Sequence, residues 1–461
     1  EMLRQFNQKV NEVFPLINMG SRGAGYLASW LSTCRGLIFH SLKMNFIYNV
    51  LERTADDSTA CPSVILNRID ISANKDHVMA TRTEEAFTKN TAFGQAFTQL
   101  QSTDPIAFRR PKPIGAEPHF AMRVLFQKEN VQGDGGPYRQ FFTDISKELA
   151  EVLPLLVPCP NAQTKIGNNR DKFVVTPSSN SRTYLKMFRF LGQLMGMALR
   201  TGVMLSIDLP SFFWKPLVGL TPQSQDIRDI DHSFHTVLKY LKTCSPEVFE
   251  GESRTIFDHF QTTLSDKSKT LLKPGGDSLE VTYDNRLEYC RLAETARCNE
   301  SSLQIMEIRR GLADFVPLSL LSMFTWQDLQ WRVCGRPQID LKLLKRHTEY
   351  AEGLTPTSPH IRYFWQVLRS FSQEDRRAFV RFAWAQERLP ADDQEFARSQ
   401  TRMMIKQGPT SDQVFPTADT CFFNLSLPVY SSPDILRERL LFAIHTDGAM
   451  DNDRPNHNDD R

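Results

Sequence analysis

The sequence lacks several features that would assign it to a whole class of protein. Lys and Arg (55) almost balance Asp and Glu (53) over 461 residues, so no strong field of one sign favours nucleic acid or an anionic membrane. No apolar run approaches the roughly 18 residues of a membrane span, and the first residues do not have the layout of a signal peptide. These absences predict a soluble protein without nucleic-acid or membrane partners, located in the cytoplasm with the nucleus as a second location.

The sequence also lacks cysteines at the spacings typical of metal sites or redox motifs. The eight cysteines are scattered, with no C-x-x-C pair and no Cys/His cluster at zinc spacing, so we expect free thiols and no metal site. The G-x-x-x-x-G-K-[ST] phosphate loop, the G-x-S-x-G nucleophile elbow and the H-E-x-x-H zinc motif are absent as well. No cofactor is implied.

Helical periodicity is present from the first residues. The chain is long enough for roughly two to four domains. Apolar residues between Met2 and Phe14 recur at helical spacing, and the apolar stretch from Tyr26 to Leu51 is interrupted by Arg35 and Lys43, which fits a packed helix pair. We expect residues 1–105 to form a helical extension packed on the rest of the chain, with a regulatory or partner surface as the alternative.

The middle of the chain contains a strand, a glycine-rich turn and a long helix. Residues 121–126 predict a strand, and the glycine-rich turn at 133–136 leads to Pro137, which fits the first position of a helix better than a phosphate site. Tyr184 to Gly202 predicts a core helix with one apolar face. Its internal glycines, Gly192 and Gly196, would allow a close neighbour.

The stretch from Pro416 to Tyr430 carries the strongest chemical pattern. Alternating apolar residues after Cys421 predict a strand with one buried face, and Asp419 and Thr420 ahead of it suggest a loop. A cysteine at such a junction can present its sulfur to solvent while the strand fixes its direction, as a nucleophile requires. By residue type alone, a small buried cysteine is the commoner alternative.

Thr420-Cys421-Phe422, followed by Leu425, Leu427, Pro428 and Tyr430, resembles the active-site segment of the HECT-type E3 ubiquitin ligases. The resemblance continues in the family's order from about residue 105 to 450. Its other motifs are the glycine-rich turn with Arg139 and two Phe, the Tyr184–Gly202 helix, Asp208-Leu209-Pro210, Gly311–Leu321, Cys334-Gly335, Thr355–Trp365 and Arg381–Pro390. The chain is thus identified as similar to a HECT domain with an amino-terminal helical extension.

The resemblance implies an α+β fold of two lobes. A mostly helical N-lobe would span residues 106–386, with a subdomain at about 235–315 that docks the ubiquitin-conjugating enzyme (E2). The Arg381–Pro390 segment would be the hinge, and a small α/β C-lobe, 387–450, would carry the nucleophile. The family usually has a glycine where this hinge has Ala385. Residues 451–461 are predicted to be disordered, because they are polar.

The resemblance also implies a chemistry. Cys421 would accept ubiquitin from an E2 as a thioester and pass it to a lysine of a protein substrate, with Thr420 in a positioning role. Many members have His at the position of Asp419, and a carboxylate there would raise the thiol pKa rather than lower it. Asp419 is therefore a candidate general base toward the incoming lysine, or a solvated loop acid.

Two alternatives use different chemistry. A cysteine hydrolase, such as a deubiquitinase or a papain-like protease, would need a His oriented toward Cys421, and the signatures around such nucleophiles are absent. A catalytically silent adaptor would keep the fold and bind ubiquitin or an E2 without transfer. The chain begins without methionine, which suggests a fragment of a longer protein.

Overall fold

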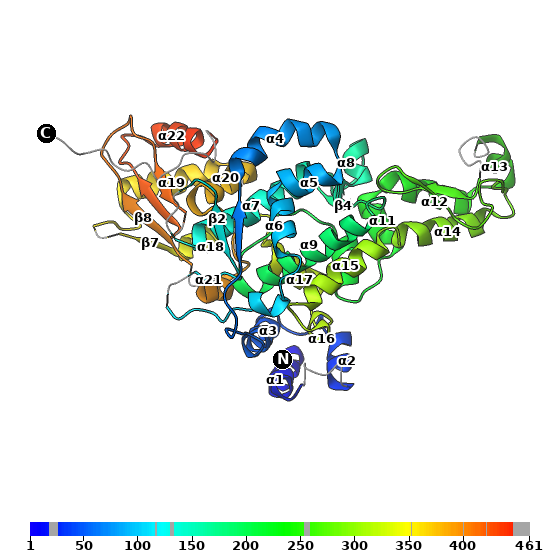
Figure 1. The fold of residues 1–461 in the computed structure, drawn as a ribbon, viewed down its shortest axis with the longest axis horizontal. Coiled ribbons are helices and arrows are strands. Elements are labelled where there is room, and N and C mark those ends of the chain that lie inside the picture. Colours follow the sequence, from blue (N-terminus) through cyan, green and yellow to red (C-terminus); the bar gives the residue numbers. More distant parts are fainter. Residues whose placement is uncertain are drawn as a thin grey trace.

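The protein has an α+β fold, as predicted, in which helices predominate. The structure is a computed structural model that describes residues 1–17, 26–115, 118–129, 133–252, 259–351, 353–399, 401–420 and 422–445. A central body carries a helical arm on one side and a mixed module on the other (Figure 1). Within these ranges, no helix has the length and apolar character needed to cross a bilayer.

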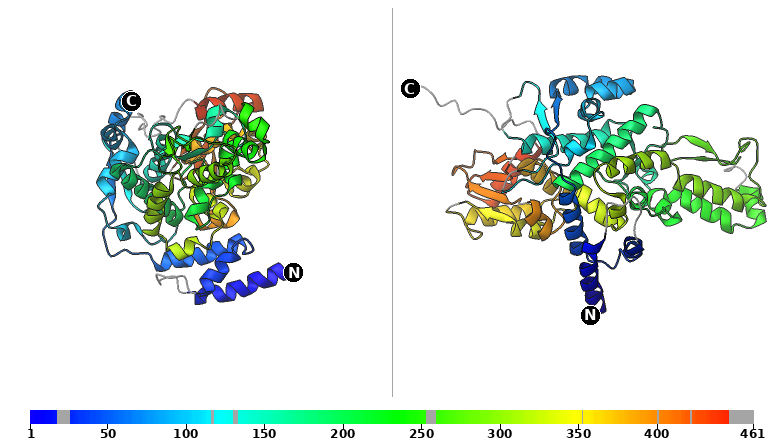
Figure 2. Two further views of the ribbon diagram at one scale, coloured as in Figure 1. Left: turned by 90° about the vertical axis from the view of Figure 1, so that its right-hand side faces the viewer. Right: turned by 60° about the horizontal axis from the view of Figure 1, so that its bottom comes forward.

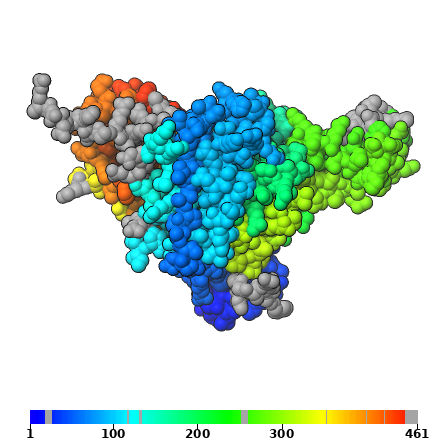
Figure 3. All heavy atoms as spheres, viewed as in Figure 1, coloured from blue at the N-terminus to red at the C-terminus, as the bar shows by residue number. Residues whose placement is uncertain are grey.

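Residues 1–105, the predicted extension, are mostly helical in the described part. The helices are α1 (Met2–Val13), α2 (Tyr26–Thr33), α3 (His40–Arg53), α4 (Arg68–Thr81), α5 (Glu84–Asn90) and α6 (Ala92–Leu100). In both views of Figure 2, α1 lies at the lower edge of the molecule, and Figure 3 shows α4–α6 covering one face of the body. α3 joins the body through a buried ion pair between Lys43 and Asp328.

A short strand in the extension was not predicted. β1 (Ser63–Leu66) pairs in parallel with β2 (Arg123–Phe126), which lies at the predicted strand. The extension also contacts α7 (Gly135–Glu151), because the Glu148 carboxylate accepts hydrogen bonds from the backbone N–H groups of Ala92 and Phe93 at the start of α6. Phe93 packs edge to face on Phe190, with ring centroids 5.3 Å apart. The extension is thus part of the same hydrophobic interior as the body.

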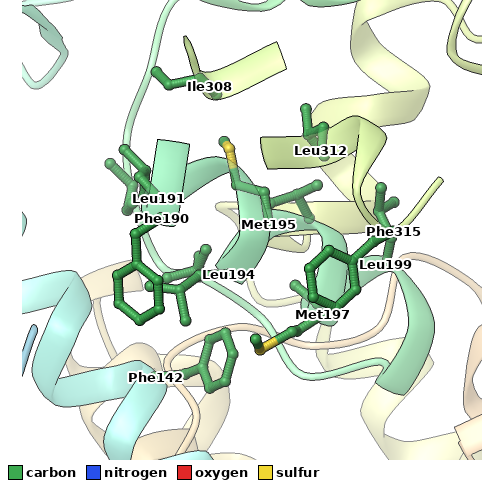
Figure 4. Packing of buried hydrophobic residues seen from close by; sticks show 14 of the residues in the cluster. Phe142, Phe190, Leu191, Leu194, Met195, Met197, Leu199, Ile308, Leu312 and Phe315 are labelled. Atoms are coloured by element: carbon green, nitrogen blue, oxygen red, sulfur yellow. The ribbon is translucent and has the colours of Figure 1, made fainter. Parts of the chain in front are cut away.

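The first core is built around α9 (Arg182–Thr201), which matches the helix predicted at Tyr184–Gly202 and ends at Gly202 with φ +85°. α9 packs closely on α15 (Ser302–Ala313), and Figure 4 shows their apolar side chains facing each other. A Cβ on Gly192 would lie 2.0 Å from the carbonyl oxygen of Ile308. The predicted close neighbour of the α9 glycines is therefore α15. Other elements of the body are β3 (Leu156–Pro158), α8 (Pro160–Thr164), β4 (Phe173–Val175), α10 (Ser211–Leu217), α16 (Leu318–Leu321) and α17 (Trp326–Cys334).

The arm has a small core of its own. It contains α11 (Ser224–Ile230), α12 (His232–Thr243), α13 (Pro246–Glu252), β5 (Gln261–Thr263), β6 (Lys269–Leu271) and α14 (Arg286–Cys298). Buried residues from Leu238 to Ala293 form this core. The docking subdomain predicted at about 235–315 covers the arm from α12 onward but not α11, and it also includes α15, which packs in the first core.

The second core lies in the mixed module at the other end. It combines α18 (Leu341–Arg346), α19 (Pro359–Ser370), α20 (Gln373–Trp384), α21 (Asp393–Ser399) and α22 (Pro433–His445) with a four-stranded sheet of β7 (Thr348–Tyr350), β8 (Met403–Gln407), β10 (Asn424–Leu427) and β9 (Thr417–Asp419), in that order. β7 and β10 run parallel to β8, and β9 runs antiparallel to β10. α20 packs on β9 and β10, and α22 packs on α19 and α20.

The chain passes from the first core to the second near Ile339. Apart from Met204, the buried residues of the second core run from Ile339 to Ile444. The boundary predicted at residues 386 and 387 lies inside this range, since α19 and α20 share their interior with the sheet. The predicted tail at 451–461 lies outside the described residues.

Candidate functional site

The candidate site is built on the β9–β10 hairpin of the second core. Asp419 pairs with Asn424, so that residues 420–423 connect the two strands. Asp419 is the last residue of β9, and the loop predicted at this position is wrong: Ala418 is buried while Thr417 and Asp419 are exposed, which is the alternation of a strand at the edge of a sheet. Thr420 comes next, in a turn, as predicted.

Cys421, the predicted nucleophile, lies outside the described residues. Its two neighbours differ in environment: Thr420 is half-buried, whereas the Phe422 side chain is 69% exposed. Phe423 is buried and has φ +54°, a left-handed conformation that is unusual for an aromatic residue. Its ring stacks on Trp384 with a centroid separation of 4.9 Å and an interplanar angle of 9°. This stacking anchors the carboxyl side of the connection.

Arg139 anchors the other side. Its Nη2 donates a hydrogen bond of 2.9 Å to the backbone carbonyl oxygen of Thr420, 281 residues away in sequence. Arg139 belongs to α7, which begins at Gly135, so Pro137 occupies the third position of the helix rather than the predicted first. The sequence predicted only that a helix starts in this segment. No local pattern could have revealed the contact, because it depends on how the two cores are placed.

Residues 385–388 are held by the first core. The Ala385 carbonyl oxygen accepts a hydrogen bond of 2.8 Å from Thr143 Oγ1, and the buried Arg388 forms an ion pair with Asp208, with Nη2 and Oδ1 2.9 Å apart. Burial raises the pKa of Asp208, but the charges of Arg388 and Lys172 outweigh it and lower the pKa below its usual value. This carboxylate is therefore ionised beside Arg388.

The extension contacts the second core as well. The Tyr48 hydroxyl on α3 donates a hydrogen bond of 2.7 Å to Glu395 Oε2 on α21, and Arg398 of α21 lies 3.8 Å from the centroid of the Tyr48 ring. Burial raises the pKa of Tyr48 far above its usual value, so the hydroxyl keeps its proton and remains a donor. α3 thus bridges both cores, through Asp328 on α17 and Glu395 on α21.

A cavity of about 930 Å³ lies where the two cores and α3 meet. Phe422, Phe423 and Asn424, which follow Cys421 in the sequence, contribute to its wall. Eight Lys or Arg side chains and four Asp or Glu side chains line it, a formal excess of four positive charges. The sequence did not predict this concentration, since the whole chain has a formal net charge of only +2.

The seven described cysteines are free thiols, as predicted. Burial raises the pKa of Cys334 to about 12 and the pKa values of Cys290 and Cys298 to about 11. These three thiols stay protonated near neutral pH and are poor nucleophiles.

The sequence of this chain matches a family model and several known proteins. Residues 143–453 match the family model described as HECT-domain (ubiquitin-transferase). The chain is 33% identical over 426 residues to the human E3 ubiquitin-protein ligase HERC2, covering 91% of this chain and 8% of that protein. It is 31% identical over 458 residues to the human probable E3 ubiquitin-protein ligase HECTD4 (91% and 11%), and 31% identical over 329 residues to the zebrafish (Danio rerio) E3 ubiquitin-protein ligase HACE1 (70% and 35%). The chain therefore spans only a small part of these relatives.

Proposed function

Because the chain belongs to the HECT-domain (ubiquitin-transferase) family, we propose that it accepts ubiquitin from an E2 as a thioester on Cys421 and transfers it to a lysine of a protein substrate. The observation that carries the proposal is the family match over 143–453, which includes the Thr420-Cys421-Phe422 motif. Burial raises the pKa values of Cys290, Cys298 and Cys334, which makes those three thiols poorer candidates for the nucleophile.

The first reaction is an exchange of thioesters. The Cys421 thiolate attacks the carbonyl carbon that joins the ubiquitin carboxyl terminus to the E2 cysteine, a new C–S bond forms, and the E2 thiolate leaves. In the second reaction, a neutral lysine amine attacks the new thioester, a C–N bond forms, the Cys421 thiolate leaves, and the amine gives up a proton. Bonds of the same type are exchanged in the first step, so the protein contributes mainly positioning.

Within this proposal, the second core is the C-lobe and the first core, with the arm, is the N-lobe. We place the junction at Gly335–Ile339, because the change of core occurs there. Gly335 has φ +69°, and a Cβ on it would lie 2.5 Å from the sulfur of Met204, so this position favours glycine. The arm would dock the E2. Its exposed apolar side chains, including Tyr240, Leu271 and Leu287, support that assignment.

Asp419 and Thr420 take secondary parts in this proposal. Asp419 is exposed at the end of an edge strand, a position from which a carboxylate can meet an incoming lysine and accept its proton. Thr420 positions the nucleophile, and its carbonyl bond to Arg139 supports that role.

The test is a thioester assay with an E2 already loaded with ubiquitin. On a non-reducing gel, the wild-type chain gains the mass of ubiquitin, and a reducing agent removes the adduct. Cys421→Ala abolishes the adduct, whereas Cys34→Ala, at a half-buried thiol far from the motif in sequence, retains it. A chain that binds the loaded E2 without forming an adduct is an adaptor, and one that only releases free ubiquitin is a hydrolase. Either outcome refutes the proposal.

A further inference from the structure

The cavity between the two cores has a charge that the transfer reaction does not explain. Its four carboxylates include three that pair with lining cations: Asp134 with Arg123, Glu349 with Arg402 and Glu395 with Arg332. Within each pair the two charges cancel, so the positive excess comes from other side chains that line the cavity.

The excess comes from cations that are bound to neutral oxygens. Arg110 donates to the carbonyl oxygen of Thr59, Lys112 donates to that of Arg398, and Arg398 donates to that of Met44. Within the described part of the chain, none of these three cations has an ion-pair partner within 4.0 Å. A carbonyl oxygen satisfies a donor but leaves its charge uncompensated, so the cavity attracts anions.

The cavity also reaches the residues that follow Cys421 in the sequence. Phe422 and Asn424, on the carboxyl side of Cys421, line it, and the exposed Phe422 ring stands at its border. A substrate lysine that approaches Cys421 would bring its neighbouring residues close to this positive wall. A lysine flanked by neutral or basic residues would be repelled, whereas acidic flanks would offset the repulsion.

We propose that the cavity selects protein substrates in which the acceptor lysine is flanked by Asp or Glu, because the positive wall formed by Arg110, Lys112 and Arg398 binds those flanking carboxylates. This inference rests on the proposed function. A peptide segment suits the site better than nucleic acid, because the site is a cavity of about 930 Å³ between two cores rather than an open basic face, and the chain as a whole is almost neutral.

The same wall has a second effect on the acceptor. Nearby positive charge disfavours the protonated form of an amine, so a lysine held beside the wall loses its proton more readily. Acidic flanks bring the lysine in, and the residual positive charge favours its nucleophilic form.

The experiment measures discharge of the preformed ubiquitin thioester of the full chain to two synthetic peptides. Each contains one lysine, flanked either by two Asp on each side or by two Gln on each side. We expect discharge to the acidic peptide to be about tenfold faster, which is the combined effect of a few exposed ion pairs that each contribute a few-fold. The preference should fall toward unity near ~0.5 M salt, because exposed charges are then screened.

The ratio of the two rates is then measured in charge-reversal variants. Arg110→Glu combined with Lys112→Glu should reduce the ratio to about one or invert it, since the wall loses its excess charge. Lys342→Glu combined with Arg437→Glu changes the net charge equally at exposed positions that do not line the cavity, and should keep the wild-type ratio. Both rates are measured with the same variant, so a general loss of activity lowers both rates and leaves their ratio unchanged. Single variants at Arg110 and Lys112 serve if the double variant fails to fold.

The outcomes separate the inference from the proposed function. Failure to form the thioester refutes the proposed function. A thioester that discharges equally to both peptides, or a ratio that the control pair changes as much as the cavity pair, overturns the inference alone. If a single-stranded oligonucleotide blocks discharge to both peptides equally and the cavity variants relieve that block, the site binds nucleic acid and the inference is wrong.

Discussion

Replacing Tyr48 tests whether the contact between α3 of the extension and α21 stabilises the second core. In Tyr48→Phe, the aromatic ring remains to pack against Arg398, while the hydrogen bond to Glu395 and the interaction of the hydroxyl with Arg332 are lost. Glu395 is then left with Arg332, whose Nε lies 3.7 Å from Oε2. The Glu395 side chain is only 10% exposed, so water replaces the lost donor poorly.

The expected magnitude depends on the type of bond. A hydrogen bond to a charged group contributes about 1.5–3 kcal/mol, which corresponds to a roughly ten- to hundredfold change in a local opening equilibrium. α21 should therefore exchange its amide hydrogens about ten- to hundredfold faster in Tyr48→Phe than in the wild type. Hydrogen exchange resolved at the level of peptides measures this change in Asp393–Ser399.

The control removes a hydroxyl of the same kind within the second core. Tyr350→Phe deletes the acceptor of the 3.0 Å bond from Trp365 Nε1 and should leave the α3–α21 contact intact. Exchange in α21 that stays within twofold of the wild type in Tyr48→Phe, or that increases equally in Tyr350→Phe, would show that α3 does not hold the second core.

Three further substitutions test the packing and the electrostatics, each with urea unfolding as the measurement. Gly311→Ala would place a Cβ 1.9 Å from the carbonyl oxygen of Arg189 and force α9 and α15 apart, so we expect a loss of about 3 kcal/mol, and an unchanged midpoint would contradict the close packing. Ala385→Gly should gain about 0.5–1 kcal/mol, because Ala385 has φ +55° and glycine adopts this conformation without strain; a lower midpoint would refute this account. Asp208→Asn should destabilise the protein at pH 7 and progressively less as the pH falls from about 4 toward 3. The lowered pKa of Asp208 means that its ion pair with Arg388 stabilises the fold above the unfolded-state pKa and is lost below the folded-state pKa, and a difference that is constant with pH would contradict this.

Local signals allowed the sequence to predict some elements well. The Tyr184–Gly202 helix was predicted nearly to the residue because its apolar periodicity and its terminal glycine lie within one short stretch. The strand at Asn424–Leu427 was predicted for a similar reason, because its alternating apolar residues are adjacent in the sequence. β1 was missed because its parallel partner β2 is about 60 residues away in the sequence, and a strand of four residues gives little pattern.

The parts that the sequence did not supply depend on contacts between distant segments. The hinge at Arg381–Pro390, taken from a motif, stays a prediction, and hydrophobic packing changes from one core to the next near Ile339. The bond from Arg139 to Thr420 and the positive cavity exist only once the two cores and α3 are placed together. The sequence alone identified the motif around Cys421. The residues that surround this motif in space could be identified only from the structure.

The hydrogen bonds from the first N–H groups of α6 to Glu148 limit how far the chain can be shortened from its amino terminus. The segment that sequence comparison assigns to the family starts at residue 143, inside α7. A fragment cut there would leave Glu148 without the two N–H groups it serves and would uncover the Phe190 ring that Phe93 now shields. We therefore expect a fragment that starts at residue 143 to be less stable than the full chain, so its failure to form a thioester would not count against the activity of the full chain.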